Sequence, residues 1–250
     1  MSSFSVLSIK TSIFLNDQEL IPFLISSLES KIKKKSELEN KVLAITSKII
    51  SLSQGQVVSK KNIKSKKKLI QKEADVYLGK MGFNTHLTIK HGLLLASAGI
   101  DESNSKKNDY ILLPKNPFQT ADEICLQLKS HWKLKNFGIL ITDSKTSPLR
   151  AGVTGITLSH SGFKGIQNKI GDKDLFGKKL QMTKINIADA LASAAVFCMG
   201  ESNERTPLAL ISAPVEFVKP FRAKSKSECI MRLENDMYAT LFFKKKFLKT

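Results

Sequence analysis

Residues 137–143, Phe-Gly-Ile-Leu-Ile-Thr-Asp, give the clearest indication of the fold. An uninterrupted apolar run of this length is typical of a buried strand. Asp143 follows the run directly, so the sequence predicts that the strand ends there and that Asp143 opens a loop. Loops that follow strands are where the side chains of α and β proteins converge on a ligand. We therefore expect Asp143 to belong to a binding or catalytic site.

Further strands and helices alternate on both sides of this run. Apolar patterns predict strands over residues 4–10, 42–50, 91–98, 110–113, 207–213 and 237–243, and helices over residues 17–35, 120–132 and 187–199. Thr120 followed by Glu123 has the pattern of a capping box for the second helix. Asn186 can cap the third helix and Gly200 can close it. The order of these elements predicts an α+β fold with mixed sheets and flanking helices.

The composition is that of a folded protein. A chain of 250 residues, 42% apolar and 25% charged, can bury one large core or two small ones, which excludes global disorder. Three cysteines, at positions 125, 198 and 229, have neither zinc-ligand spacing nor the even number of a disulfide framework. The N-terminus lacks a basic segment, and no run reaches the ~18 apolar residues of a membrane span. We expect a cytoplasmic protein in a reducing compartment.

The net charge of +18 invites a nucleic-acid or anionic-membrane interpretation. The excess is nearly all lysine and lies in short runs at residues 31–35, 60–68 and 244–249, without the arginine and aromatic residues that stack on bases. Nucleic-acid binding is therefore less favoured, although the same field can draw nucleotides or polyglutamate-like anions towards a cleft. Residues 59–68 have no apolar periodicity and predict a mobile basic loop insertion.

Oxygen-bearing side chains gather at three places that could hold a divalent cation. Asp101 begins the polar segment Asp-Glu-Ser-Asn, residues 101–104. Ser144 stands beside Asp143, and Glu201 follows a predicted helix. Carboxylate and hydroxyl oxygens are ligands of Mg²⁺ and Mn²⁺, which stay partly hydrated until phosphate arrives. The competing interpretation is that each aspartate is a turn former whose side chain caps its own backbone.

Two segments could contact phosphate. Ser47 and Lys48 end an apolar strand, and a second segment places Arg150 just before Gly152. Glycines permit close backbone approach, and an arginine can place two hydrogen bonds on phosphate oxygens. The competing interpretations are a surface ion pair for the first segment and a strand bulge for the second. The usual signatures do not occur: residues 171–179 fail the Walker pattern, and the sequence has neither GxGxxG nor GxSxG.

A series of short motifs occurs in a characteristic order. The motifs are Thr46-Ser47-Lys48 with Gly55, His91-Gly92, Ala98-Gly99-Ile100-Asp101-Glu102-Ser103-Asn104, Leu112-Leu113-Pro114, Thr142-Asp143-Ser144 with Arg150 and Gly152, Ile187-Ala188-Asp189-Ala190-Leu191-Ala192, and Met199-Gly200-Glu201. This order resembles that of the coenzyme F420 γ-glutamyl ligases, over about residues 5–217. Gly-Ile-Asp-x-Ser-Asn together with Ala-Asp-x-Leu-Ala is the specific combination.

The resemblance implies a GTP-using ligase with divalent metals, a two-lobed α+β fold and an intertwined homodimer, so that residues 1–250 form a single unit of two lobes. The metal ligands that it implies are Asp101, Asp143, Ser144 and Glu201. The expected nucleotide contacts are Ser47, Lys48, Asn104, Arg150 and Gly152. Lys48 and Arg150 are also expected to neutralise charge during catalysis. A monovalent cation is a further candidate cofactor.

In the expected mechanism an acceptor carboxyl group takes the γ-phosphoryl group of GTP, and the amine of L-glutamate attacks the resulting acyl phosphate. Residues 144–149 depart from the Gly-Arg-Pro-Trp type of stretch usual in coenzyme-modifying members, so the acceptor is a deazaflavin coenzyme or a folate-like molecule. Two other classes stay open. One is a metal-dependent nucleotide phosphohydrolase. The other is a basic nucleic-acid-binding protein on a degenerate ligase scaffold, against which the three acidic residues argue.

Overall fold

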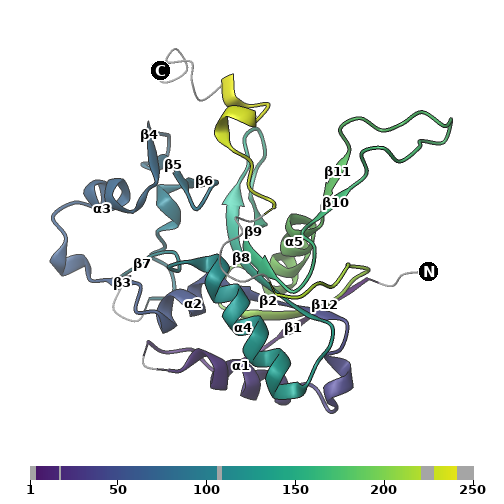
Figure 1. Ribbon diagram of the computed structural model, residues 1–250. Coiled ribbons are helices and arrows are strands. Elements are labelled where there is room, and N and C mark those ends of the chain that lie inside the picture. Colours follow the sequence, from purple (N-terminus) through teal and green to yellow (C-terminus); the bar gives the residue numbers. More distant parts are fainter. Residues whose placement is uncertain (1–3, 17, 106–108, 221–227, 241–250) are drawn as a thin grey trace.

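The central element of the structure is a five-stranded mixed sheet. The computed structural model describes residues 4–16, 18–105, 109–220 and 228–240. In sheet order the strands are β1 (Ser5–Ile9), β12 (Leu208–Ser212), β2 (Lys41–Thr46), β8 (Phe137–Thr146) and β9 (Val153–Ser161). β2 and β8 are parallel, and the other neighbouring pairs are antiparallel (Figure 1). The predicted α+β fold class is confirmed.

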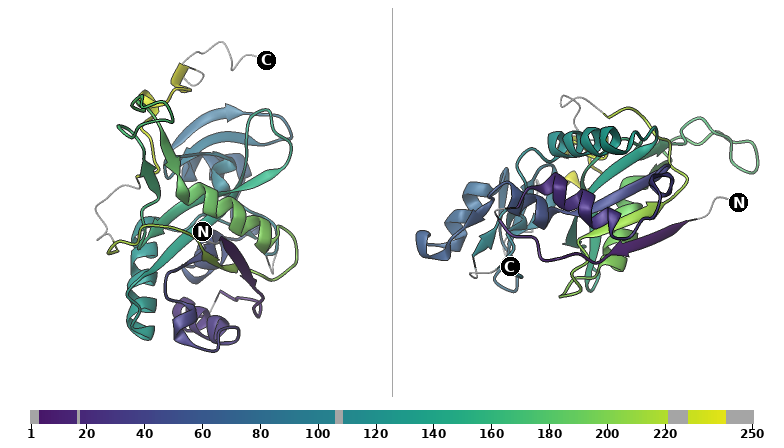
Figure 2. Two further views of the ribbon diagram at one scale, coloured as in Figure 1. Left: turned by 90° about the vertical axis from the view of Figure 1, so that its right-hand side faces the viewer. Right: turned by 90° about the horizontal axis from the view of Figure 1, so that it is seen from below.

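Helices cover both faces of this sheet. They are α1 (Leu20–Glu29), α2 (Ser47–Ser53), α4 (Pro117–Trp132) and α5 (Ile187–Met199). A further helix, α3 (Lys66–Glu73), packs apart from this sheet, and 3₁₀ helices occur at Lys35–Glu37, Lys60–Asn62, Ser97–Gly99 and Leu233–Asn235. Successive strand side chains point to opposite faces, so Leu43 and Ile45 pack with α1, α2 and α4. Val42 and Ala44 pack on the other face with α5 (Figure 2). Within the described ranges, no helix is long and apolar enough to cross a membrane.

Helix α5 has the ends that the sequence predicts. The side chain of Asn186 accepts a hydrogen bond from the backbone N–H of Asp189 at 3.0 Å, and Gly200 follows the last helical residue. The helix packs closely on β9 at Gly155, where an added Cβ would lie 2.2 Å from the carbonyl oxygen of Ala192. Glycine therefore allows the two backbones to approach each other directly beside the site described below.

A smaller group of elements lies beside the main sheet (Figure 1). It contains the sheet β4 (Val76–Lys80), β5 (His86–Lys90) and β6 (Leu93–Ala96), and the pair β3 (Val57–Val58) and β7 (Tyr110–Ile111). Leu69 and Ile70 of α3 form a separate small core with Ile100 and Leu112. The prediction that residues 1–250 form one unit of two lobes stays a prediction.

A long hairpin projects from the main body (Figure 1). Its base pairs β10 (Ile166–Asn168) with β11 (Lys184–Asn186), and residues 169–183 form the rest of this arm. Leu175 and Phe176 are 98% and 95% exposed, so two large apolar side chains stand uncovered on the arm.

Two strands differ from their predicted extents. The run of residues 42–50 contains a strand and the start of a helix, because Ile49 and Ile50 form the buried side of α2. The strand predicted for residues 137–142 continues to the end of β8, because β9 pairs with its full length. Asp143 therefore lies inside a strand and not in a loop.

Two predictions about helices and loops are corrected. Helix α4 begins at Pro117 with Asn116 as its N-cap, so Thr120 lies inside the helix and forms no capping box. Residues 59–68, predicted as a mobile loop, form a 3₁₀ turn and the beginning of α3. That helix exists because its two apolar residues are buried in the small core.

The strand predicted for residues 237–243 is wrong where the structure describes it. Residues 237 and 238 form a turn, residues 239 and 240 are helical, and residues 241–243 lie outside the described residues. The other predicted elements are confirmed, several in shortened form, as β1, α1, β6, β7, α5 and β12.

Candidate functional site

A cavity of about 470 Å³ brings together most of the residues that the sequence predicts to bind metal and nucleotide. This volume is that of a small-molecule site. Segments that are far apart in the sequence line it, within residues 11–14, 46–52, 99–104, 111–113, 142–144 and 196–207. The predicted residues in its lining are Ser47, Lys48, Asp101, Asn104, Asp143, Ser144 and Glu201.

The carboxyl ends of β2 and β8 position the first groups. These parallel strands pair Thr46 with Thr142, so both run to the same edge of the sheet. Lys48 lies in the first turn of α2, directly after β2. Asp143 continues β8, where its side chain is half-buried and its Oδ1 accepts the backbone N–H of Ser144 at 2.8 Å. An ammonium group that follows β2 and a carboxylate from within the adjacent strand β8 therefore enter the cavity side by side.

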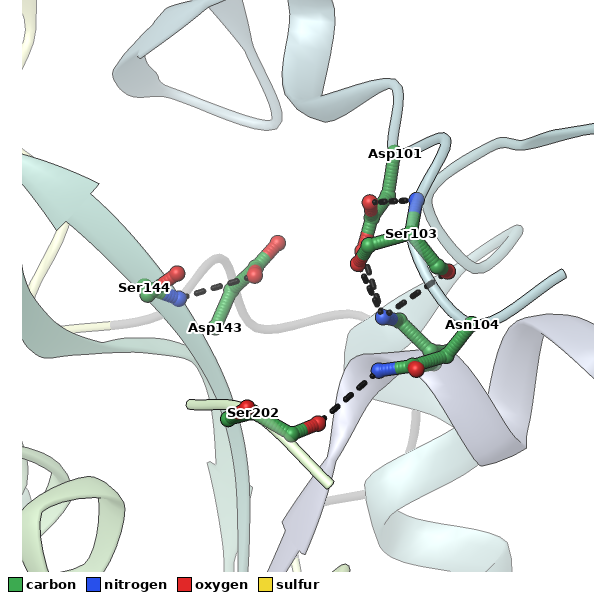
Figure 3. A network of polar contacts seen from close by, with 7 residues as sticks. Asp101, Ser103, Asn104, Asp143, Ser144 and Ser202 are labelled. Atoms are coloured by element: carbon green, nitrogen blue, oxygen red, sulfur yellow. Dashed lines mark hydrogen bonds and ion pairs between the residues drawn. The ribbon is translucent and has the colours of Figure 1, made fainter. Parts of the chain in front are cut away.

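Asp101 enters the cavity from the smaller group of elements (Figure 3). Its backbone is fixed by paired hydrogen bonds with Ile111, of 2.9 and 2.8 Å. Its Oδ2 lies 2.6 Å from Lys48 Nζ, and its Oδ1 accepts the backbone N–H of Ser103 at 2.7 Å. Lys48 Nζ also donates to Ser103 Oγ at 3.0 Å. This ion pair links the main sheet to the loop that carries Asp101.

The loop after α5 carries Glu201 and is fastened to both sides of the cavity. The side-chain amide of Asn104 donates to the carbonyl oxygen of Ser202 at 3.0 Å (Figure 3). At the other end of the loop, the backbone N–H of Thr46 donates to the carbonyl oxygen of Pro207 at 3.0 Å. Glu201 is therefore held near the other two carboxylates before any ligand binds.

The carboxyl groups of the cavity have perturbed pKa values. Burial raises the pKa of Asp143 to about 7, and the neighbouring charges of Asp101 and Glu201 add to the rise. Burial also raises the pKa of Glu201, against a hydrogen bond from the Ser144 side chain. Burial acts the same way on Asp101, but hydrogen bonds from Lys48 and the adjacent loop outweigh it and lower the pKa of Asp101. The cationic and hydrogen-bonding groups of the protein therefore compensate the negative charge of these three carboxylates only in part.

These oxygen donors fit a hard divalent cation. Asp101, Asp143 and Glu201 supply carboxylates and Ser144 a hydroxyl group, which are the ligand types of Mg²⁺ and Mn²⁺. A cation would favour the ionised form of Asp143, which burial disfavours. Across the described ranges, no three His, Cys, Asp or Glu side chains lie close enough to form a metal-binding cluster. The four donors therefore do not by themselves form a complete set of metal ligands.

Two predicted nucleotide contacts lie elsewhere. Arg150 and Gly152 are exposed in the turn between β8 and β9 and do not line the cavity. Arg205 lines it instead, although the sequence analysis did not single it out. Its backbone is left-handed, with φ of 58°, and its carbonyl oxygen accepts the N–H of Thr11 at 2.9 Å. The one signal in the sequence is that Arg205 follows Glu201 by four residues.

Known proteins provide the comparison for this cavity. A family model described as F420-0:Gamma-glutamyl ligase matches residues 8–213. The chain belongs to this family. The lining of the cavity lies within the matched region of this F420-0:γ-glutamyl ligase family member, so the candidate site belongs to the part that it shares with the family. The predicted family and class of enzyme, a ligase that forms carbon–nitrogen bonds, are confirmed.

Several relatives in the family are methanogen proteins. The chain is 34% identical over 229 residues to a coenzyme F420:L-glutamate ligase of Methanococcus maripaludis strain C7, covering 85% of this chain and 90% of that protein. It is 30% identical over 223 residues to the ligase of the same name from Methanopyrus kandleri, covering 82% and 88%. A third such ligase, from Methanocaldococcus jannaschii, is 36% identical over 188 residues, covering 68% and 74%.

Proposed function

We propose that this protein is a GTP-dependent γ-glutamyl ligase that joins an acceptor carboxyl group to the amine of L-glutamate. The observation that carries the proposal is the cavity in which three acidic residues, Asp101, Asp143 and Glu201, meet Lys48 and Arg205. Carboxylates able to hold a divalent cation beside two cationic side chains suit a triphosphate. The relatives' names, coenzyme F420:L-glutamate ligase, suggest the amino acid and the acceptor.

The reaction has two steps. An oxygen of the acceptor carboxylate attacks the γ-phosphorus of GTP, the bond from that phosphorus to the bridging oxygen breaks, and GDP leaves. The nitrogen of glutamate then attacks the acyl carbon of the acyl phosphate. Inorganic phosphate leaves with the electrons of the carbon–oxygen bond, and the nitrogen loses a proton. Phosphorylation comes first because a free carboxylate is a poor electrophile.

The protein's contribution is to hold charges and reactants in place. Mg²⁺ or Mn²⁺, held by the four oxygen donors described above, would supply charge neutralisation at the phosphate oxygens. Lys48 is already fixed by Asp101 and Ser103, so its ammonium group requires little reorganisation. Arg205 can place two parallel hydrogen bonds on phosphate oxygens, the role that sequence analysis gave to Arg150. Ser47, at the start of α2, is a further candidate phosphate contact.

For the acceptor we propose a deazaflavin coenzyme, with a folate-like molecule as the alternative. Both have a flat ring system and a carboxyl group. One side of the cavity is apolar and includes Ile13, Phe14, Leu52 and Leu113. An apolar surface of this kind suits either ring system, because ligand pockets combine apolar walls with a few polar groups.

We also propose that the ligase is a homodimer, as the family resemblance implies. The projecting arm supports this proposal, because Leu175 and Phe176 are almost fully exposed on it. Uncovered apolar side chains on a projecting element are typical of an association surface. A second copy of the chain would remove them from water.

Mass spectrometry of the reaction products tests the proposed activity. The protein is incubated with GTP, Mg²⁺, L-glutamate and either a deazaflavin or a folate acceptor. We expect the acceptor to gain one glutamyl unit while GDP and phosphate form, and Asp143→Asn to abolish the gain. GTP hydrolysis at the same rate without glutamate and acceptor, with no glutamyl product, would overturn the proposal in favour of a phosphohydrolase.

A further inference from the structure

A second cavity, of about 660 Å³, lies outside the proposed active site beside α3. Its lining includes the apolar residues Val57, Ile63 and Leu112. Its other side chains include four lysines, Lys64, Lys68, Lys72 and Lys115, and one carboxylate, Glu73. A lining that combines apolar residues with an excess of positive charge is complementary to a molecule that has several negative charges and an apolar part. We call this second cavity the basic groove.

Lys68 and Lys72 lie four residues apart in α3, on one side of the helix, and Lys64 stands just before the helix begins. Like charges four residues apart destabilise a helix. In addition, α3 has no acidic residue in its first turn to offset them. Within the described part of the chain none of the three forms an ion pair, and all three are exposed. Their charge is therefore available to a ligand.

The neighbouring lysines are used differently. Lys60 Nζ lies 2.6 Å from Glu102 Oε2, and Lys66 pairs with the other oxygen of the same carboxylate. Both ammonium groups also lie over the ring of Tyr110, at 5.0 and 5.6 Å from its centroid. Because Glu102 directly follows Asp101, these contacts attach the lysine-rich segment to the loop that carries a proposed metal ligand. The basic groove is therefore held in a fixed relation to the active site.

The two cavities are also neighbours across one short segment. Leu112 lines both of them. On the groove side, the backbone N–H of Lys115 donates to the side chain of Gln54 at 2.7 Å, which fixes the fourth lysine to the residue that directly follows α2. One ligand could therefore have a group in each cavity.

We propose that the basic groove binds an oligoanionic part of the acceptor, carrying two or more carboxylate or phosphate groups, while a carboxyl group of the same molecule reaches the active site. This inference rests on the proposed ligase function. Amide formation consumes one acceptor carboxylate and brings the two carboxylates of glutamate. The product therefore has one more negative charge than the acceptor, and an acceptor that already carries glutamyl units becomes a better ligand for the groove.

Charge reversal inside and outside the lining of the basic groove tests the proposal. Lys68→Glu with Lys72→Glu alters the groove, and the control Lys61→Glu with Lys67→Glu makes the same change in net charge outside its lining. Calorimetric binding of γ-linked triglutamate and of tripolyphosphate is measured without divalent cations. We expect the groove pair to weaken probe binding at least about tenfold and the control pair less than about threefold. Both pairs change the long-range screened field equally, so the difference between them measures direct contacts in the groove. Lys68→Gln with Lys72→Gln replaces the groove pair if that pair does not fold.

The two probes separate carboxylate from phosphate ligands, and each further outcome has a definite meaning. If both pairs weaken probe binding equally, a long-range electrostatic field is sufficient to explain the binding, and the proposal is overturned. Loss of RNA binding in the groove pair with unchanged probe binding would also overturn it, in favour of a nucleic-acid surface. If the groove pair has the same KM for the acceptor as wild type, the groove does not bind the acceptor, and the inference is overturned while the ligase proposal stays intact. Groove-dependent probe binding in a wild-type protein without ligase activity would instead overturn the ligase proposal alone.

Discussion

Asp143→Asn is expected to make the metal-free protein more stable at pH 8, although it removes a proposed metal ligand. The carboxyl group of Asp143 is half-buried, and burial raises its pKa from 3.8 to about 7. The folded state therefore holds the proton more tightly than the unfolded chain does. The stabilising contribution is complete below about pH 4 and is lost as the pH rises through about 7.

The size of the effect follows from the change in pKa. One pKa unit corresponds to about 1.36 kcal/mol, so a rise of roughly three units would cost about 4 kcal/mol at pH 8 in a fully shielded site. Because the side chain partly reaches solvent, we expect about 2 kcal/mol. Asparagine has the size of aspartate but does not ionise. Wild type and variant should therefore have nearly equal free energies of unfolding at pH 4, and the variant should gain steadily up to about pH 7.

Urea unfolding at pH 4, 6 and 8 in the presence of a chelator measures this difference. Asp172→Asn is a matched control, because Asp172 is exposed on the arm and its partner there is Lys169, at 3.2 Å. A surface pair of this kind should change the free energy of unfolding by less than about 1 kcal/mol at every pH. If Asp143→Asn is less stable than wild type at pH 8, the reasoning that the ionised carboxylate of Asp143 destabilises the metal-free protein is refuted.

The same experiment with Mg²⁺ tests the metal site. A ligand that binds the folded state stabilises it by RT ln(1 + [L]/Kd), so wild type should gain stability as Mg²⁺ is added. Asp143→Asn should gain little or nothing because one carboxylate ligand is missing. Equal stabilisation of both proteins by Mg²⁺ would place the cation elsewhere and remove Asp143 from its ligands.

Arg205→Gln should lower kcat/KM with GTP by about 10- to 100-fold, because it removes a charge-assisted hydrogen bond of about 1.5–3 kcal/mol. Arg150→Gln should change kcat/KM less than about twofold. Equal losses of kcat/KM in the two variants would instead support the sequence prediction that Arg150 contacts the nucleotide. Gly155→Ala should destabilise the protein by about 2 kcal/mol or more in urea unfolding, because the added Cβ would meet the backbone of α5. The control Gly82→Ala should not destabilise it in this way, because the space around Gly82 is open. Phe176→Glu should convert a dimer to monomers in light scattering, and an unchanged mass would exclude this part of the arm from the interface.

Local sequence patterns located the three carboxylates of the site because each stands beside a strong apolar element. They did not single out the arginine that lines the cavity, Arg205. Arg150 and Arg205 both lie in polar turns, and what separates them is a long-range hydrogen bond from Thr11 that holds the second turn against the cavity. A contact between residues so far apart in the sequence leaves no periodic signal.

The errors in element boundaries have a similar origin. Residues 42–50 are mostly apolar, with apolar residues on both sides of Thr46-Ser47-Lys48, and periodicity cannot show where a buried strand gives way to the buried side of a helix. Residues 59–68 lack an amphipathic pattern because their lysines outnumber their apolar residues. Part of that segment is nevertheless helical, since Leu69 and Ile70 just beyond it are buried and Glu102 neutralises two of its lysines. In both cases tertiary contacts decide what local propensity leaves open.

The chain as a whole is strongly positive, whereas the cavity contains more acidic than basic side chains. The chain as a whole carries +18, which draws anions from a distance that salt limits to about 10 Å at 0.1 M. Inside the cavity, however, Asp101, Asp143 and Glu201 face Lys48 and Arg205, and burial raises the pKa of two of the three carboxyl groups. A bare cavity of this kind would repel a triphosphate at close range, while a divalent cation would reverse its sign. The lysine-rich surface can therefore collect anionic substrates, but a cation among the carboxylates is what would let one of them bind.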